Sequence, residues 1–238
     1  MIETHIHILS QIDDGPQNFP ESMQLVKAFK NEGIQNIIAT PHFWQGYWEP
    51  SKEEIQKKVK TLNTAITQLK WNITLFPGCE LRLTPDLFSK CSLSSFQTLN
   101  NSFYLLVDVY PDLTKNHYQQ LKHIKKSKLT PILAHPERYE SLKQEENVQK
   151  IIDIGVILQL VNSSLLSQKS SIKKQALHFL KNDYYSIIGS DSHNNFDQLF
   201  LVSETKKEII DTVGEKKFEL LTETNCAKIL NNQPIEQI

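Results

Sequence analysis

Histidines and acids at alternate positions are the residues of this chain whose types and spacing could do chemistry. One residue separates His5 from His7, and one separates Asp191 from His193. In an extended strand, alternate side chains project to the same face, so each pair could reach one divalent ion. Imidazole suits zinc, iron and related transition metals, whereas carboxylates favour manganese and magnesium. For an isolated pair, packed or surface histidines are the commoner interpretation, so the surrounding elements must decide.

Those elements are predicted to form an α/β fold, because short apolar segments alternate with amphipathic helical ones along the 238 residues. Strands are expected at residues 2–8, 34–40, 72–79, 103–109, 129–134, 156–161 and 185–188. Helices are expected at residues 22–32, 52–69, 116–126, 148–154, 169–180, 197–212 and 215–230. This alternation indicates a parallel architecture. We find no linker or repeat and expect one domain over residues 1–238.

Every expected strand stops beside a residue that could bind a metal or a phosphate. The candidate metal ligands are His5, His7, Asp14, His42, Glu80, Asp108, His135, Asp191 and His193; Arg138 and Asn162 are further polar residues in such positions. In (β/α) barrels the reactive face is the carboxyl end of the strands. This ring of polar residues at the strand ends therefore favours a TIM-like barrel over an open sheet. Nine ligands are too many for one ion, so we expect two or three, with Glu80 as the bridge. Paired ions suit in-line displacement at phosphorus.

Composition excludes several other classes. A net charge of -1 gives no reason to expect a nucleic-acid partner or an anionic membrane surface. No apolar run approaches the length of a membrane span, and residues 1–5 lack the pattern of a secretory signal. The 3 cysteines have no Cys-x-x-Cys spacing, which favours a reducing, cytoplasmic location.

Several segments, in order along the chain, resemble the polymerase-and-histidinol-phosphatase (PHP) family. They are His5-Ile6-His7, Asp13-Asp14-Gly15-Pro16, Thr40-Pro41-His42, Pro77-Gly78-Cys79-Glu80, Ala134-His135-Pro136-Glu137-Arg138-Tyr139, Val161-Asn162-Ser163-Ser164 and Ser190-Asp191-Ser192-His193. The most similar branch is that of the manganese-dependent bacterial protein-tyrosine phosphatases of capsular and exopolysaccharide synthesis. The resemblance implies hydrolysis of phosphotyrosine on a bacterial tyrosine kinase that regulates this synthesis.

The resemblance also implies a PHP-type distorted (β/α)7 barrel with a cluster of divalent ions, manganese first, with iron, zinc or magnesium as alternatives. One ion would be held by His5, His7, Glu80 and Asp191, a second by Glu80, Asp108 and His135, and a third by Asp14, His42 and His193. Two departures stand out. Residue 108 is Asp where relatives commonly have Glu, and residues 194–198 contain no arginine where relatives place a phosphate-binding one.

We expect a metal-activated hydroxide to attack phosphorus, with Arg138, His42 and Asp14 as catalytic residues. The general acid is unassigned. Arg82 and Arg138 are the only arginines, and each lies within three residues of an expected ligand. Because arginine binds phosphate bidentately, our hypothesis is that Arg82 replaces the missing downstream arginine. The alternative is a rim salt bridge, for example to Asp86.

The loop after His42 is rich in aromatic residues. Residues 43–48 read Phe-Trp-Gln-Gly-Tyr-Trp, and Trp44 could flank a tyrosine ring or simply pack over the barrel rim. Asn162 could bind substrate or be structural. Three rival functions stay open: another PHP phosphoesterase such as a histidinol-phosphate phosphatase, an amidohydrolase, or a non-catalytic metal-binding partner protein. An amidohydrolase is disfavoured because Asp108 stands where a bridging lysine is common. A homo-oligomer is also left open.

Overall fold

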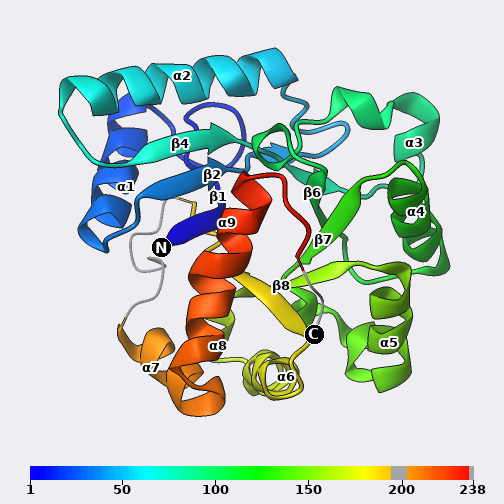
Figure 1. Cartoon of the computed structure of the whole chain (residues 1–238). Helices are drawn as coiled ribbons and strands as arrows, with labels where there is room; N and C mark the ends of the chain where they lie inside the picture. The colour runs from blue at the N-terminus through cyan, green and yellow to red at the C-terminus, as the bar shows by residue number, and fades with distance from the viewer. Residues whose placement is uncertain (194–202, 236–238) are drawn as a thin grey trace.

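The computed structural model describes residues 1–193 and 203–235, in which strands and helices alternate (Figure 1). The strands are β1 (Ile2–Ile6), β2 (Asn36–Ala39), β3 (His42–Phe43), β4 (Thr74–Pro77), β5 (Glu80–Arg82), β6 (Tyr104–Asp108), β7 (Thr130–Ala134), β8 (Ile157–Val161) and β9 (Tyr185–Gly189). The helices are α1 (Phe19–Asn31), α2 (Lys52–Gln68), α3 (Leu87–Lys90), α4 (Lys115–Lys126), α5 (Glu145–Ile154), α6 (Ser170–Lys181), α7 (Ser203–Val213), α8 (Glu215–Glu219) and α9 (Asn225–Leu230).

All the strand pairings are parallel, as the alternation predicted. One sheet has the order β1-β2-β4 and the other the order β3-β5-β6-β7-β8-β9. The carboxyl end of β1 also meets the segment after β9, where the Asp191 amide donates to the carbonyl of His5 at 2.8 Å and the His7 amide to the carbonyl of Ser192 at 2.9 Å. The ends of β1, β2 and β9 therefore lie next to one another.

The described chain has two more strands than the seven that were predicted. The expected strand at residues 34–40 ends before Pro41, because proline cannot donate a hydrogen bond to a ladder. The short strand β3 begins immediately after this proline. The expected strand at residues 72–79 breaks at Gly78 and resumes as β5. A Cβ on Gly78 would lie 2.8 Å from Ile38 Cγ2, so only glycine allows this close approach. Each break is followed at once by an expected ligand, His42 or Glu80.

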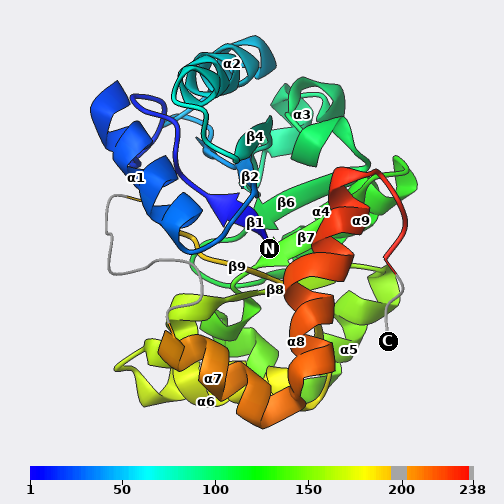
Figure 2. The same ribbon diagram turned by 60° about the vertical axis from the view of Figure 1, so that its left-hand side comes forward.

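Helices lie outside the strands (Figures 1 and 2). Apolar residues fill both sides of the strands. One buried cluster joins the strands to α1, α2, α4, α5 and α6. A second cluster lies among the strands and includes Ile38, Leu106 and Ile187 together with Cys226 and Ile229 of α9. The carboxyl-terminal helices therefore close the inner cluster, away from the carboxyl ends of the strands.

The expected helices are present, with shifted ends. Helix α1 begins three residues before the expected start at residue 22, because Asn18 caps it with its side chain and Pro20 occupies its first turn. Of the expected helix at residues 197–212, residues 197–202 lie outside the described part. Residues 215–230 are helical throughout, with a π turn at Leu220–Thr224 between α8 and α9. No helix in the described ranges has the length and apolar character needed to cross a bilayer.

Candidate metal centre

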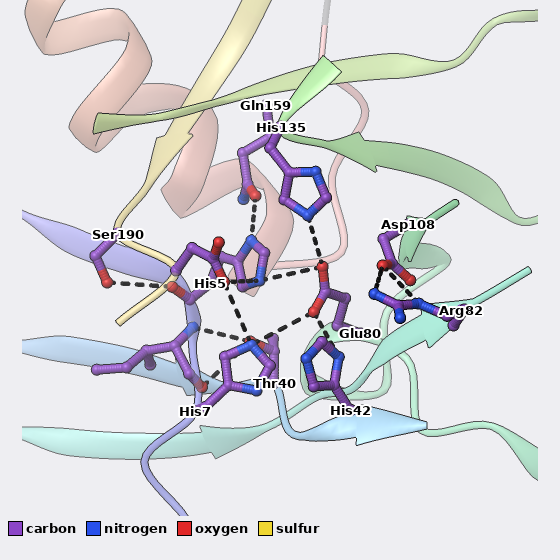
Figure 3. Close-up of polar contacts among 12 residues, drawn as sticks. His5, His7, Thr40, His42, Glu80, Arg82, Asp108, His135, Gln159 and Ser190 are labelled. Atoms are coloured by element: carbon purple, nitrogen blue, oxygen red, sulfur yellow. Dashed lines mark hydrogen bonds and ion pairs between the residues drawn. The ribbon is translucent and has the colours of Figure 1, made fainter. Parts of the chain in front are cut away.

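The polar residues expected at the strand ends converge around one buried carboxylate, Glu80 (Figure 3). They come from the carboxyl ends of the strands or from the loops that follow: His5 in β1 and His7 after it, Asp14 in the next loop, His42 in β3, Glu80 in β5, Asp108 in β6, His135 after β7, and Asp191 and His193 after β9. Glu80 Oε1 lies 3.2 Å from His135 Nε2 and 3.4 Å from His5 Nε2. Glu80 Oε2 lies 2.8 Å from His42 Nδ1 and 3.4 Å from His7 Nε2.

These residues fall into three overlapping groups whose ligand atoms lie within 4.8 Å of one another. The groups are His5, His7, Glu80 and Asp191; Glu80, Asp108 and His135; and His7, Asp14, His42 and His193. All nine side chains proposed from the sequence are included, and Glu80 belongs to two groups. His7 also belongs to two groups, which the sequence alone did not indicate.

Buried polar atoms at the centre of the site favour a bound cation. His5 Nε2, His7 Nε2, His42 Nδ1, Glu80 Oε2 and Asp108 Oδ1 are each buried, with no hydrogen-bond partner of adequate geometry among the described residues. Leaving such atoms unsatisfied is costly, whereas metal coordination would satisfy them together. The donor set of imidazoles and carboxylates also fits a divalent transition metal.

Neighbouring side chains lower the pKa values of three carboxyl groups in the site. Burial opposes ionisation of Glu80, yet the neighbouring His5 and His42 hold its pKa well below the usual range. Burial likewise opposes ionisation of Asp14, but its hydrogen bond with His193 lowers the pKa to about 2. Asp191 also has a lowered pKa, because His5 and Arg138 outweigh the effect of its burial. Glu80, Asp14 and Asp191 are therefore available as anionic ligands at neutral pH.

Three neighbouring side chains each form a hydrogen bond with a ligand imidazole, through the ring nitrogen that faces away from Glu80. His7 Nδ1 lies 2.7 Å from Asp13 Oδ2, His5 Nδ1 lies 2.7 Å from Gln159 Oε1, and His135 Nδ1 lies 3.2 Å from the hydroxyl of Tyr139. Such partners fix the orientation of a metal-binding histidine. Sequence reasoning missed all three, although Asp13 and Tyr139 stand inside quoted motifs; Gln159, on β8, had no local signal.

Local backbone geometry also serves the site. His135 and Asp191 have φ values of 38° and 55°, in the left-handed region that side chains other than glycine adopt at a cost. Gly189 allows β9 to approach β1, since a Cβ there would lie 2.6 Å from His5 Cβ. Cys79, next to Glu80, packs in the apolar core.

Both arginines line a cavity of about 370 Å³ that opens over the site. Arg138 Nη2 lies 2.8 Å from Asp191 Oδ2. Arg82 donates from Nε to Asp108 Oδ2 at 2.9 Å and contacts the same oxygen through Nη2. Arg82 therefore forms a salt bridge, as the alternative interpretation suggested, but its partner is Asp108 and the suggested partner Asp86 is wrong.

Aromatic side chains surround Arg82 at the edge of this cavity. The Arg82 guanidinium lies 4.2 Å from the centre of the Trp44 ring and 5.6 Å from that of Tyr110, which lines the cavity and is 71% exposed. Trp48 stacks on His42 with ring centres 5.6 Å apart. Asn162 is buried after β8 and is absent from the residues that line the cavity. The structure thus brings Trp44 and Arg82 together but leaves Asn162 outside.

Comparison with known proteins identifies the family. A model of the family described as "Capsular polysaccharide synthesis, CpsB/CapC" matches residues 1–231. The chain belongs to the CpsB/CapC family. Tyrosine-protein phosphatase CpsB of Streptococcus agalactiae serotype III is 30% identical over 243 residues, with 99% of this chain and 100% of that protein covered. Tyrosine-protein phosphatase YwqE of Bacillus subtilis is 26% identical, with 99% and 93% covered.

Solved structures agree on the fold of this CpsB/CapC chain. A structure described as YwqE from Bacillus subtilis and CpsB from Streptococcus pneumoniae, "unique metal-dependent tyrosine phosphatases", aligns with a TM-score of 0.90 at 24% identity, covering 100% of this chain and 97% of that one. A histidinol phosphate phosphatase from Lactococcus lactis aligns with a TM-score of 0.57 at 12% identity, covering 91% and 93%. The resemblance recognised in the sequence motifs is confirmed.

Proposed function

We propose that this chain is a metal-dependent protein-tyrosine phosphatase acting on a bacterial tyrosine kinase that regulates capsular or exopolysaccharide synthesis. The observation that carries the proposal is the convergence of eight ligand-type side chains around a ninth, Glu80, beneath a cavity lined by two arginines. The reaction class is supported by relatives named tyrosine-protein phosphatases that align with nearly the whole chain.

The three groups of side chains would hold two or three divalent ions, manganese first, with iron, zinc or magnesium as alternatives. His5, His7, Glu80 and Asp191 would hold one ion; Glu80, Asp108 and His135 a second; and Asp14, His42 and His193 a third. When bound, such ions polarise phosphoryl oxygens and lower the pKa of water. Asp13, Gln159 and Tyr139 would keep the imidazoles turned toward the ions.

The arginines and the aromatic rim would bind the substrate. Arg138 is partly exposed at the cavity, and its guanidinium can share its N–H groups between Asp191 and a phosphoryl oxygen. Arg82 lies at the aromatic edge of the cavity, where Trp44 would flank the tyrosine ring. His42 and Asp14 complete the wall of the same cavity and would act there as catalytic residues with Arg138.

We also propose that the strands close into a distorted (β/α)7 barrel within a single domain spanning residues 1–238. The β2–β3 and β4–β5 segments each continue in one direction across a short break, which reduces nine strands to seven. The hydrogen bonds from the segment after β9 to β1 would close the ring. A cytoplasmic location is consistent with the three free cysteines.

The test is hydrolysis of a phosphotyrosyl peptide by the purified protein with manganese, with chelator, and in a His5→Ala/His7→Ala variant. His123→Ala is the matched control, because His123 is an exposed histidine on α4, outside the three groups. We expect turnover that needs the metal, is lost in the double variant and persists in the control.

Three results would contradict the proposal. Turnover that survives chelation would rule out the metal mechanism. Faster turnover of histidinol phosphate than of the peptide would instead assign a small-molecule phosphatase. Metal binding without turnover of either ester would indicate a non-catalytic partner protein.

A further inference from the structure

A second cavity, between α4 and α5, is strongly basic. Its volume is about 780 Å³, and it is lined by Lys115, Tyr118, Lys122, Lys125, Lys126, Asn147, Lys150, Asp153 and Ile154. We call it the lysine groove. Five lysines face one aspartate there, although the whole chain has a net charge of -1. Helices α4 and α5 lie next to each other on one side of the molecule (Figure 1).

The lysines of α4 form one stripe along the groove. Lys115, Lys122 and Lys126 are spaced by seven and four residues, which places them on one face of a helix. Helix α4 contains no acidic residue. Lys115, Lys122 and Lys126 are exposed, and in the described ranges no carboxylate oxygen lies within 4.0 Å of their amines. Lys150, by contrast, pairs with Glu146 at 2.8 Å. Three charges of the stripe are therefore free to meet a partner.

The groove starts beside the candidate metal centre. Val109, Tyr110 and Pro111 line the cavity over the metal ligands, and α4 begins four residues later with Lys115. The short connection is fixed, because Asp112 accepts hydrogen bonds from the amide and the hydroxyl of Ser141. The chain that forms the wall of the active-site cavity thus leads directly into the stripe.

We propose that the lysine groove binds an acidic segment of the phosphotyrosyl protein, flanking the phosphotyrosine that enters the active-site cavity. The proposal rests on the proposed phosphatase function and adds the chemistry of the substrate around the target tyrosine. From Lys115 to Lys126 the helix rises about 16 Å. An extended peptide covers that distance with about five residues. Three acidic residues within such a stretch would match the three unpaired lysines.

A recessed groove fits a peptide better than a membrane surface. The α5 side of the groove carries Glu146 and Asp153. A flat anionic bilayer that contacted the lysines would also contact these two acids, which would repel it. A single extended chain can follow the α4 stripe and avoid those acids. Lysine amines act as point charges without a required geometry, so the attraction should be salt-dependent and tolerant of sequence.

The kinetic test compares phosphotyrosyl peptides with acidic and neutral flanks, together with a small aryl phosphate. The variant is Lys115→Glu/Lys122→Glu/Lys126→Glu. The control, Lys27→Glu/Lys57→Glu/Lys60→Glu, makes the same charge change at exposed lysines of α1 and α2. For the wild type we expect a KM at least tenfold lower for the acidic peptide at low salt. The groove variant should lose this preference with kcat and aryl phosphate turnover unchanged, whereas the control should keep it.

A binding test separates failure of this proposal from failure of the phosphatase function. A fluorescent acidic peptide with phenylalanine in place of phosphotyrosine should bind the wild type and the control variant, but not the groove variant, whether or not any ester is hydrolysed. Equal KM values for acidic and neutral peptides, or equal binding by all three proteins, would overturn the proposal. So would groove-dependent binding of phosphatidylserine vesicles without any effect on the peptides.

Discussion

The carboxylate of Asp13 provides the sharpest test of how the candidate metal centre is built. Asp13 is 8% exposed and forms hydrogen bonds with His7 and His42, which both belong to the three metal groups. Its Oδ2 accepts from His7 Nδ1 at 2.7 Å and from the His42 amide at 2.9 Å, and its Oδ1 accepts from the Gly15 amide at 3.0 Å. All three contacts need an acceptor, which a carboxylate supplies on both oxygens.

Asp13→Asn keeps the shape and removes one acceptor together with the charge. If the new side-chain NH2 group takes the place of Oδ1, it faces the backbone N–H of Gly15, which is also a donor. If it takes the place of Oδ2, it faces the donors His7 Nδ1 and the backbone N–H of His42. One buried donor left unpaired costs about 1–3 kcal/mol of stability. Loss of the partner that orients a metal-binding histidine typically costs about 10–100-fold in metal affinity, which corresponds to about 1.4–2.7 kcal/mol.

Calorimetric titration of manganese into the metal-free proteins at neutral pH measures the affinity, and a thermal melt measures the stability. Asp211→Asn on α7 is the control, because Asp211 is exposed and belongs to none of the three groups. We expect a weaker affinity and a lower Tm for Asp13→Asn only. A manganese affinity within twofold of the wild type would refute the idea that Asp13 positions His7 for the metal.

Three further predictions address other parts of the site. Burial raises the pKa of Glu3 to about 7 from 4.5, so the folded state favours the protonated acid; its stabilising contribution is complete below pH 4.5 and is lost as pH rises through 7. The stability of the wild type relative to Glu3→Gln should therefore fall by about 3 kcal/mol over that range in urea melts, and parallel profiles would refute this. Arg82→Ala should lower kcat/KM for a phosphotyrosyl peptide at least tenfold, about 1.4 kcal/mol, and an unchanged value would end its assignment to phosphate binding. Tyr139→Phe removes the hydroxyl between His135 and the Val109 amide and should destabilise the protein by about 1 kcal/mol, read from the urea midpoint; an unchanged midpoint would contradict that role.

Much of the candidate site could be predicted because strand geometry is periodic. Alternate positions in β1 put His5 and His7 on one face, and the parallel fold brings the ends of all strands to one edge. Eight of the nine residues that the structure gathers stand in the quoted motifs, and the ninth, Asp108, was named from its place at the end of an expected strand. The two strand breaks were harder to predict. Pro41 signals an interruption, but the resumption of the strand at His42 depends on pairing with β5.

Of the three orienting residues, Gln159 escaped prediction because its contact spans a long sequence distance, whereas Asp13 and Tyr139 lie close in sequence to the histidines that they orient. His5 and Gln159 are 154 residues apart, and nothing around Gln159 distinguishes it from any other polar residue on a strand. Arg82 is similar: its charge and its place near Glu80 were visible, but its partner was not. Asp86 is near Arg82 in sequence, whereas the actual partner, Asp108, lies beside Arg82 on the paired strand β6.

The amino-acid sequence by itself determined the class of fold, the identities of the metal-ligand candidates and the family resemblance. These depend on residue types, local spacing and periodicity, which are properties of short segments. Only the tertiary structure decided which nitrogen of each imidazole faces Glu80, which carboxylate holds Arg82, and that the lysines of α4 face α5 across a groove beside the active-site cavity. Each of these is a contact between segments distant in the chain, and it exists only once the strands and helices have packed together.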